Sequence, residues 1–232
     1  MDGFLSPADL TALGVTLRLA MISTGLMLVL FTPLAWGLAR MRSSSKAVFE
    51  AIVALPLVLP PTVLGFYLLI ALGPRGVVGG ALESLGFGHL AFSFSGLVIG
   101  SMIYSLPFVM QPLQNAFQAL DPRLMEAAAT LRASPLDRFF TIAVPLASRG
   151  FLSAAVLSFA HTMGEFGVVI MIGGSIPGET RVASIAIFNH VETMDYAAAH
   201  GLAGVLLVIS FLLLLGVFAV NRRFARITGP GA

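Results

Sequence analysis

The side chains with the clearest chemical potential are an imidazole and a carboxylate four positions apart in an apolar run. His161 and Glu165 are flanked by uncharged residues throughout 151–172. On a continuous helix this spacing places both side chains on one face, where they can pair. A carboxylate in a long apolar segment is costly and faces a helix-bundle interior or a cavity. Glu165 therefore either fixes its segment to a neighbour through a hydrogen bond, or forms a gate contact in only one conformational state.

The other chemistry-bearing residues do not form a recognisable catalytic or metal site. Cysteine is absent, which removes thiolate catalysis, disulfide bonds and cysteine metal ligands. His190 and His200 lack the spacing of metal ligands. No P-loop, Gly-x-Ser-x-Gly or His-Glu-x-x-His pattern occurs, and His161 and Glu165 lack a nucleophile as partner. We therefore expect no metal, no cofactor, no ATP hydrolysis by this chain and no enzymatic activity.

The composition determines which elements must position these residues. Of 232 residues, 57% are hydrophobic and 10% charged, with a mean hydropathy of +0.96. The apolar residues form blocks long enough for helices to cross about 30 Å of hydrocarbon. The expected spans cover residues 13–39, 49–72, 92–117, 151–172 and 197–220. The sequence thus predicts an all-α, polytopic transmembrane helix bundle of about five spans, in a single domain over 1–232. A sixth, peripheral helix within 73–91 or 173–196 remains an alternative.

The second span should be bent. Pro56, Pro60 and Pro61 each remove a backbone donor and push the preceding residue out of helical geometry. We expect this kink to face protein or water, because lipid cannot satisfy the freed carbonyls.

The distribution of lysine and arginine predicts the orientation. If the spans alternate, one side of the membrane receives the cations between spans one and two, between spans three and four, and after span five. These are Arg40, Arg42, Lys46, Arg123, Arg132, Arg138, Arg149, Arg222, Arg223 and Arg226. The other side receives Arg18, Arg75 and Arg181. Positive charge accumulates on the cytoplasmic side, so we expect the N-terminus outside and the C-terminus in the cytoplasm.

The longest cytoplasmic segment covers residues 121–145. Asp121 followed by Pro122 is a favoured helix start, and strong helix formers follow. Ser134 and Pro135 interrupt this run and open a second short helix. Two such helices could be a simple interfacial anchor or a docking element for a soluble partner. The small side chains of 127–129 favour docking, because they permit close approach of another helix.

This segment resembles the "EAA" loop of permease subunits of bacterial binding-protein-dependent ABC importers. That pattern is Glu-Ala-Ala, three residues, Gly, and an apolar stretch ending in Pro. The matching residues are Glu126, Ala127, Ala128, Phe140, Ile142 and Pro145. Arg132 stands where the family usually has glycine. A residue other than glycine in a left-handed turn costs on the order of 1 kcal/mol, so the turn could be shaped differently here.

Three further motifs are similar to the molybdate and sulfate branch of that family. They are 55–63 (LPLVLPPTV), 164–167 (GEFG) and 176–181 (IPGETR), and they follow one another in the family's order and spacing. The resemblance covers roughly residues 10–225. It implies a type I ABC importer permease fold and transport of an oxyanion. Segment 176–181 favours molybdate, with tungstate and sulfate or thiosulfate as alternatives.

The resemblance implies a role for the residues of this loop, and residue chemistry suggests roles for others. The coupling helix that docks on the ATPase would comprise Glu126, Ala127, Ala128, Leu131, Arg132 and Phe140. From their chemistry inside the spans, the gate or pathway would comprise Pro60, Pro61, Thr62, Ser105, His161, Thr162, Gly164, Glu165 and Gly167, with packing as the alternative for the two glycines. Ser23, Thr24 and Ser101 are further hydroxyl candidates, although hydroxyls in spans more often bond other helices. The family commonly has arginine where His161 stands. Contact with the external binding protein would involve Pro177, Glu179 and Arg181, and for Arg181 a merely solvated loop charge is an equal alternative.

The implied assembly is a permease homodimer in the lipid of the bacterial cytoplasmic membrane. Two ATP-binding cassette subunits, which would bind ATP and Mg²⁺, and a periplasmic or extracellular substrate-binding protein complete it; nucleic acid has no place in it. A stand-alone channel or a proton-coupled carrier with Glu165 as relay is the alternative from another class.

Overall fold

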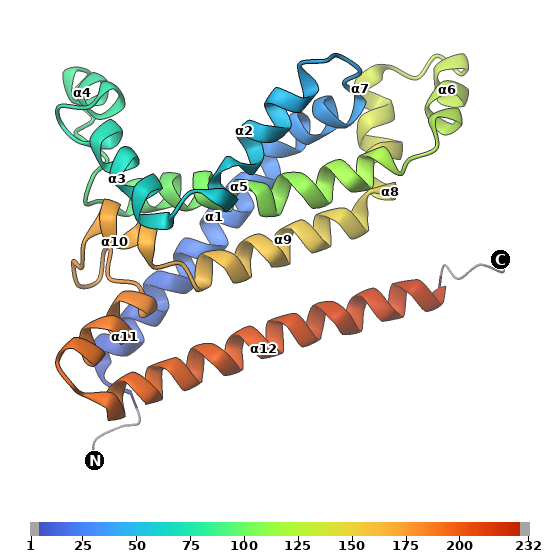
Figure 1. Ribbon diagram of the computed structural model, residues 1–232. Coiled ribbons are helices and arrows are strands. Elements are labelled where there is room, and N and C mark those ends of the chain that lie inside the picture. Colours follow the sequence, from blue (N-terminus) through green and yellow to red (C-terminus); the bar gives the residue numbers. More distant parts are fainter. Residues whose placement is uncertain (1–4, 228–232) are drawn as a thin grey trace.

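The computed structural model describes residues 5–227, without the side chains of 217, 218 and 220–227, and these residues form helices joined by turns (Figure 1). The helices are α1 (Pro7–Arg40), α2 (Lys46–Val58), α3 (Pro61–Leu72), α4 (Val77–Ser84), α5 (Phe94–Gln118), α6 (Pro122–Thr130), α7 (Pro135–Arg138), α8 (Val144–Leu146), α9 (Ser148–Met163), α10 (Gly167–Gly173), α11 (Ala183–Glu192) and α12 (Tyr196–Ile227). A π-helical segment, Phe139–Ala143, joins α7 to α8. The all-α prediction is confirmed.

Four helical segments are long and apolar enough to cross a membrane: Pro7–Arg40, Pro61–Ser84, Phe94–Gln118 and Tyr196–Gly216. A fifth candidate is the pair Pro135–Leu146 and Ser148–Met163, bent by 69°. The predicted number of about five spans agrees with this range. The orientation prediction used Arg222, Arg223 and Arg226, whose side chains lie outside the described residues.

Helix α1 begins six residues earlier than the predicted span because of a capping box. The Ser6 hydroxyl accepts a hydrogen bond from the Asp9 N–H at 3.1 Å, and the Asp9 carboxylate accepts one from the Ser6 N–H at 3.1 Å. Pro7 occupies the first turn, where its missing N–H costs nothing. These polar residues precede the apolar run and were therefore excluded from the span.

Two of the predicted spans are broken helices. The second comprises α2 and α3, separated at Leu59 and Pro60, while Pro56 lies inside α2. The fourth was predicted as one helix over 151–172, and this prediction is wrong. Helix α9 ends at Met163, and α10 starts only at Gly167. The intervening Gly-Glu-Phe is non-helical because Gly164 weakens the helix and the Ser184 hydroxyl binds the Glu165 carbonyl.

The core consists of α1, α5 and α9, which pack side by side along their lengths (Figure 1). One buried cluster, including Met27, Val109 and Leu113, lies toward the ends of these helices nearest α6 and α7. A second, including Leu19 and Leu97, lies toward their opposite ends. Helices α9 and α5 cross closely at Gly150, which has no side chain. A Cβ added there would lie only 2.3 Å from the Ala116 Cβ.

Helix α12 lies at the edge of the bundle (Figure 1) and contacts mainly α11 and α9. Its exposed residues between 207 and 215 are large and apolar: Leu207, Val208, Phe211, Leu212, Leu214 and Leu215. A surface of this kind is suited to lipid or to another apolar helix. The sequence left a sixth, peripheral helix possible in two segments. Both are partly helical, since α4 lies within 73–91 and α11 within 173–196.

We predict that Gly150→Ala destabilises the bundle. The new methyl group would overlap the Ala116 Cβ, and overpacking of this kind costs about 1–3 kcal/mol. The detergent-solubilised protein should unfold at a lower temperature. Gly25→Ala is the matched control, because no atom lies within 4 Å of its added Cβ and alanine favours helix. Equal melting temperatures for the two variants would contradict the close crossing.

Candidate functional site

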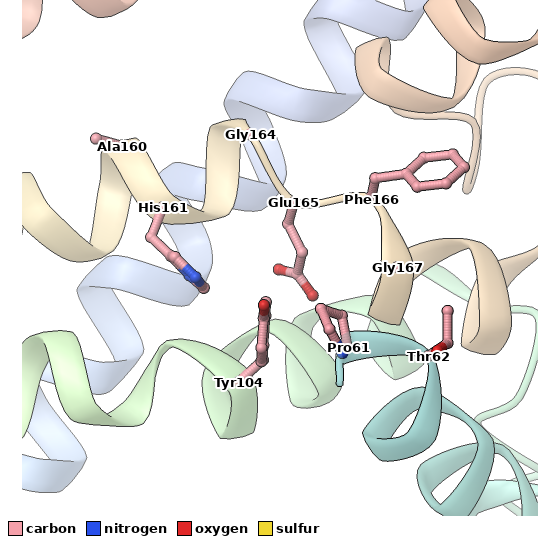
Figure 2. A pocket seen from close by; sticks show the side chains of 9 residues that line it. All are labelled: Pro61, Thr62, Tyr104, Ala160, His161, Gly164, Glu165, Phe166 and Gly167. Atoms are coloured by element: carbon pink, nitrogen blue, oxygen red, sulfur yellow. The ribbon is translucent and has the colours of Figure 1, made fainter. Parts of the chain in front are cut away.

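The two helix breaks meet at one cavity. Its volume is about 580 Å³, and Pro61, Thr62, Tyr104, Ala160, His161, Gly164, Glu165, Phe166 and Gly167 line it. Figure 2 shows these side chains around the space between α9 and α10 on one side and α3 and α5 on the other. Six of the nine residues predicted for a gate or pathway therefore share one cavity.

Glu165 is the buried acid of this cavity, with 4% of its surface exposed. Its side chain points from the break toward Tyr104 and Pro61 (Figure 2). Neither carboxyl oxygen has a hydrogen-bond partner among the described residues. No described neighbour fixes this side chain with a hydrogen bond of normal length in this conformation, although the Ser101 hydroxyl of α5 lies close enough to stabilise the carboxylate. The main chain is held instead, since the Ser184 hydroxyl donates to the Glu165 carbonyl at 2.6 Å.

The predicted pairing of His161 with Glu165 is wrong. The His161 Nδ1 lies 2.9 Å from the Ser105 hydroxyl, and its ring stacks on Phe108 with centroids 4.1 Å apart. Tyr104 also touches the imidazole, at a centroid distance of 4.7 Å. The four-residue spacing failed because the helix ends between the two residues, so Glu165 leaves the face that carries His161.

The predicted hydroxyls divide into two groups. The Ser105 hydroxyl lies 3.2 Å from the Thr162 hydroxyl and thereby joins α5 to α9 beside the cavity. Thr24 accepts a hydrogen bond from Ser158 at 3.3 Å and thus joins α1 to α9. The hydroxyls of Ser23 and Ser101 are buried without a partner among the described side chains. The structure therefore gives Thr162, Thr24 and Ser105 interhelical contacts.

Glycines bring α3 and α10 together at the rim of the cavity. A Cβ at Gly167 would lie 2.6 Å from the Pro61 Cβ, and one at Gly65 would lie 2.7 Å from the Met171 Cβ. Pro60 caps α3 without a side-chain hydrogen bond. Gly164 differs from Gly167, because a Cβ there would meet only carbonyl oxygens at 3.9 Å. Gly167 is thus required for packing, and Gly164 is not.

Tyr104, Phe108 and Phe166 are site residues that sequence reasoning missed. Tyr104 and Phe166 line the cavity, and Phe108 covers the ring of His161. Aromatic residues are common in apolar spans, so residue type alone gave no signal. The position of Tyr104 directly before Ser105, and of Phe108 one turn later, could have indicated a shared helix face.

The two short helices predicted within 121–145, called the elbow from here on, are confirmed. Asp121 caps α6 by accepting a hydrogen bond from the Arg123 N–H at 2.9 Å, and Ser134 caps α7 by accepting one from the Asp137 N–H at 3.1 Å. The Arg138 guanidinium donates to the Met125 carbonyl at 3.2 Å and ties the two helices together. Arg132 has φ +62°, so it adopts the left-handed turn that glycine normally provides.

The outer surface of this elbow exposes apolar side chains. Leu131 is 83% exposed and Phe140 64%, and Glu126 and Ala127 are exposed beside them. Ala128 is half-buried. Beneath the elbow, the ring of Trp36 contacts Phe117 and Phe139 at centroid distances of 5.1 and 5.5 Å. The elbow is therefore anchored on its inner side and open on its outer side.

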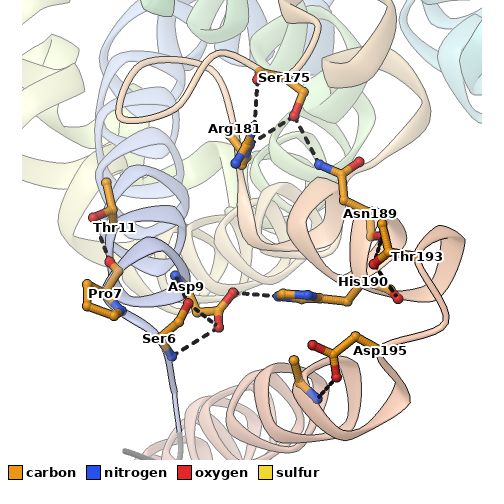
Figure 3. Close-up of polar contacts among 11 residues, drawn as sticks. Ser6, Pro7, Asp9, Thr11, Ser175, Arg181, Asn189, His190, Thr193 and Asp195 are labelled. Atoms are coloured by element: carbon orange, nitrogen blue, oxygen red, sulfur yellow. Dashed lines mark hydrogen bonds and ion pairs between the residues drawn. The ribbon is translucent and has the colours of Figure 1, made fainter. Parts of the chain in front are cut away.

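In the loop before α11, the Arg181 side chain is held by hydrogen bonds to Ser175. The Arg181 Nε donates to the Ser175 hydroxyl at 3.0 Å, and its Nη2 donates to the Ser175 carbonyl at 3.2 Å (Figure 3). Arg181 thus stabilises the loop itself, whether or not it also contacts a binding protein. Pro177 and Glu179 lie exposed on the same loop.

Comparisons with known proteins agree with this geometry. Residues 31–226 match the family described as binding-protein-dependent transport system inner membrane component. The molybdenum transport system permease protein ModB of Azotobacter vinelandii is 58% identical over 220 residues, which cover 95% of this chain and 97% of that protein. ModB of Haemophilus influenzae is 37% identical, over 80% of this chain and 81% of that one. The sulfate transport system permease protein CysT of Salmonella typhimurium is 32% identical, over 97% and 81% respectively.

Solved structures share the fold at low sequence identity. A bacterial ABC transporter involved in the import of the acidic polysaccharide alginate superposes with a TM-score of 0.73 at 19% identity, over 97% of this chain and 82% of that chain. The inward-facing MetNI methionine ABC transporter superposes with a TM-score of 0.68 at 14% identity, over 91% and 94% respectively. The fold is therefore that of ABC importer membrane subunits. The chain belongs to the family of binding-protein-dependent transport system inner membrane components.

Proposed function

We propose that the chain is the permease subunit of an ABC importer that carries molybdate across the bacterial cytoplasmic membrane. The cavity at the meeting point of the two helix breaks is the structural observation that carries the proposal. Discontinuous helices of this kind form substrate routes near the middle of the membrane in other transporters. The choice of molybdate is supported by the 58% identity to a molybdenum permease, against 32% to a sulfate permease.

The energy for transport would enter at the cytoplasmic elbow. Its exposed residues Glu126, Leu131 and Phe140 would be the ones that dock into a groove on an ATPase subunit. Closure of two ATPase subunits would draw together the elbows of a permease homodimer. The 69° bend between the elbow and α9 gives this movement a direct route to the helix that carries His161.

Orientation follows from the same assignment. The elbow must lie in the cytoplasm, where ATP is available, which places the N-terminus and α11 outside. Pro177 and Glu179, on the exposed loop before α11, would then face the external binding protein. Arg181 shapes that loop through Ser175.

Glu165 would be the gate residue. Burial of a carboxyl group without a hydrogen-bond partner is costly, so the conformation observed here is one in which its contacts are incomplete. In another transport state the break between α9 and α10 can bring the carboxyl group to a partner. Direct binding of an oxyanion by Glu165 would be opposed by charge repulsion.

Uptake by the reconstituted complex tests the substrate. The permease, its ATPase and its binding protein in liposomes should accumulate radiolabelled molybdate when ATP is enclosed with the ATPase. Tungstate, which has the same charge and tetrahedral shape, should compete, and sulfate should compete weakly. Uptake without the ATPase would instead indicate a channel or a proton-coupled carrier, and sulfate uptake at the molybdate rate would overturn the choice of anion.

Glu126→Lys tests the elbow. Reversal of charge on an exposed docking surface should weaken co-purification of the ATPase subunit about tenfold, equivalent to about 1.4 kcal/mol. Glu192→Lys, an identical change on an exposed residue at the end of α11, is the control and should leave co-purification intact. Unchanged binding of the ATPase by Glu126→Lys would show that the elbow does not dock there.

Glu165→Gln tests the gate. The amide preserves the shape of a side chain whose oxygens accept no hydrogen bond, so the melting temperature should not fall. Uptake should slow about fivefold, corresponding to about 1 kcal/mol in the barrier, because the contact of the charged group in the other state is lost. Glu83→Gln on the exposed surface of α4 is the control. Wild-type uptake by Glu165→Gln would remove Glu165 from the gate.

A further inference from the structure

One face of α5 carries a continuous row of polar and aromatic side chains. The row consists of Tyr104, Phe108, Gln111, Asn115 and Gln118. At about 100° and 1.5 Å per residue, an ideal helix places them within about 80° of arc and along about 21 Å. Gln111, Asn115 and Gln118 are exposed. Amides on a membrane span face a protein interior or water, because lipid leaves their hydrogen bonds unmade.

The outer end of the row borders the cavity of Glu165. Tyr104 lines that cavity together with His161, and its ring points between His161 and Glu165 (Figure 2). One turn further along α5, Phe108 stacks on the His161 ring at 4.1 Å with an interplanar angle of 28°. The His161 Nδ1 is held by Ser105 at 2.9 Å. The stacked pair is therefore held at the edge of the cavity, between Tyr104 and Gln111 along α5.

The inner end of the row borders a separate groove between α5 and α2. This groove has a volume of about 350 Å³, and Glu50, Val53, Ala54, Gln111, Gln114, Asn115 and Gln118 line it. The Glu50 carboxylate accepts a hydrogen bond from the Gln114 amide at 2.6 Å and lies 3.8 Å from the Lys46 ammonium. Its charge is thus partly compensated, and the exposed amides of Gln111, Asn115 and Gln118 can donate hydrogen bonds.

The groove leads toward positive charge. Gln118 also lines a pocket of about 420 Å³ together with Arg40 and Arg42, next to the elbow residues Pro122 and Met125. An anion that moves along α5 from Tyr104 to Gln118 would thus leave the cavity of Glu165, pass the neutral amides beside the partly compensated Glu50, and meet the cations last. Neutral donors bind an anion weakly enough to release it, while the cations lower its energy at the exit.

We propose that this face of α5 lines the route of the oxyanion, and that the stacked rings of Phe108 and His161 close the route between the outer cavity and the inner groove. The proposal rests on the proposed function and adds the residues along which the anion would pass. A rotation of α9 against α5 would separate the two rings and join the two spaces.

Cysteine labelling tests the route, and the absence of natural cysteine makes each single-cysteine variant unambiguous. Gln111→Cys, Asn115→Cys and Leu212→Cys are introduced one at a time into the complete complex in inside-out membrane vesicles without nucleotide. A membrane-impermeant sulfonated maleimide, itself an anion, is then added. The two cysteines on α5 should react at least about tenfold faster than Leu212→Cys, which lies on the exposed apolar face of α12. Equal rates would show that the row faces lipid or protein and would overturn the proposal.

Removal of the ring tests the closure. Tyr104→Cys should react slowly from the cytoplasmic side while Phe108 is present, and at least about fivefold faster when Phe108→Ala is added. Phe151→Ala, which removes a half-buried ring elsewhere in the bundle, is the matched control and should leave Tyr104→Cys shielded. Phe108→Leu, which retains apolar volume without the stack, should give an intermediate rate if Phe108→Ala fails to fold. Fast labelling of Tyr104→Cys with Phe108 intact would show that the rings do not close the route.

The labelling result tests the route separately from the uptake assay, which tests transport. Molybdate uptake by the wild-type complex is measured in the same preparation. ATP-dependent uptake together with a shielded Gln111→Cys would overturn the route and leave the proposed function standing. A reactive row in a complex without ATP-dependent uptake would overturn the proposed function and would still show an aqueous path along α5.

Discussion

The constraint on which this structure depends is that hydrocarbon offers no hydrogen-bond partner to a peptide group. A chain that leaves helical geometry inside a membrane must turn the freed groups toward protein or water. Two segments break in this way, at Leu59 and Pro60 and at 164–166, and both border the same cavity. Each break therefore shields the freed backbone groups of the other from lipid. The cavity, its buried acid and its glycine contacts all follow from this arrangement.

Much of the fold could be predicted from the sequence because its signals are local. Apolar blocks of membrane length indicated the spans, and the Asp121-Pro122 and Ser134-Pro135 pairs indicated the two elbow helices, which the structure confirms. Proline indicated the break in the second span. The break in the fourth span was missed because glycine in a membrane helix is tolerated, so 164–167 did not by itself signal an end. The start of α1 was missed because its capping residues are polar.

The sequence allowed several residues of the site to be predicted, but not the contacts that their side chains make. Residues on α3, α9 and α10 were assigned to one pathway, and the structure brings them to one cavity. The partner of His161 could not be predicted, since it depended on whether the helix continued for one more turn. Its true neighbours, Ser105 and Phe108, lie on α5, more than 50 positions away in sequence, and only tertiary packing brings them together. Arg132 shows the converse, because the surrounding turn imposes a left-handed backbone against the preference of the residue.

The contact between α3 and α10 has a mechanical consequence. Gly167 against Pro61, and Gly65 against Met171, leave no space in which one short helix could slide past the other. Helices α3 and α10 thus form one rigid unit, joined to the rest of their spans at Pro60 and at Gly164. A movement of α2 or of α9 would therefore tilt both short helices together.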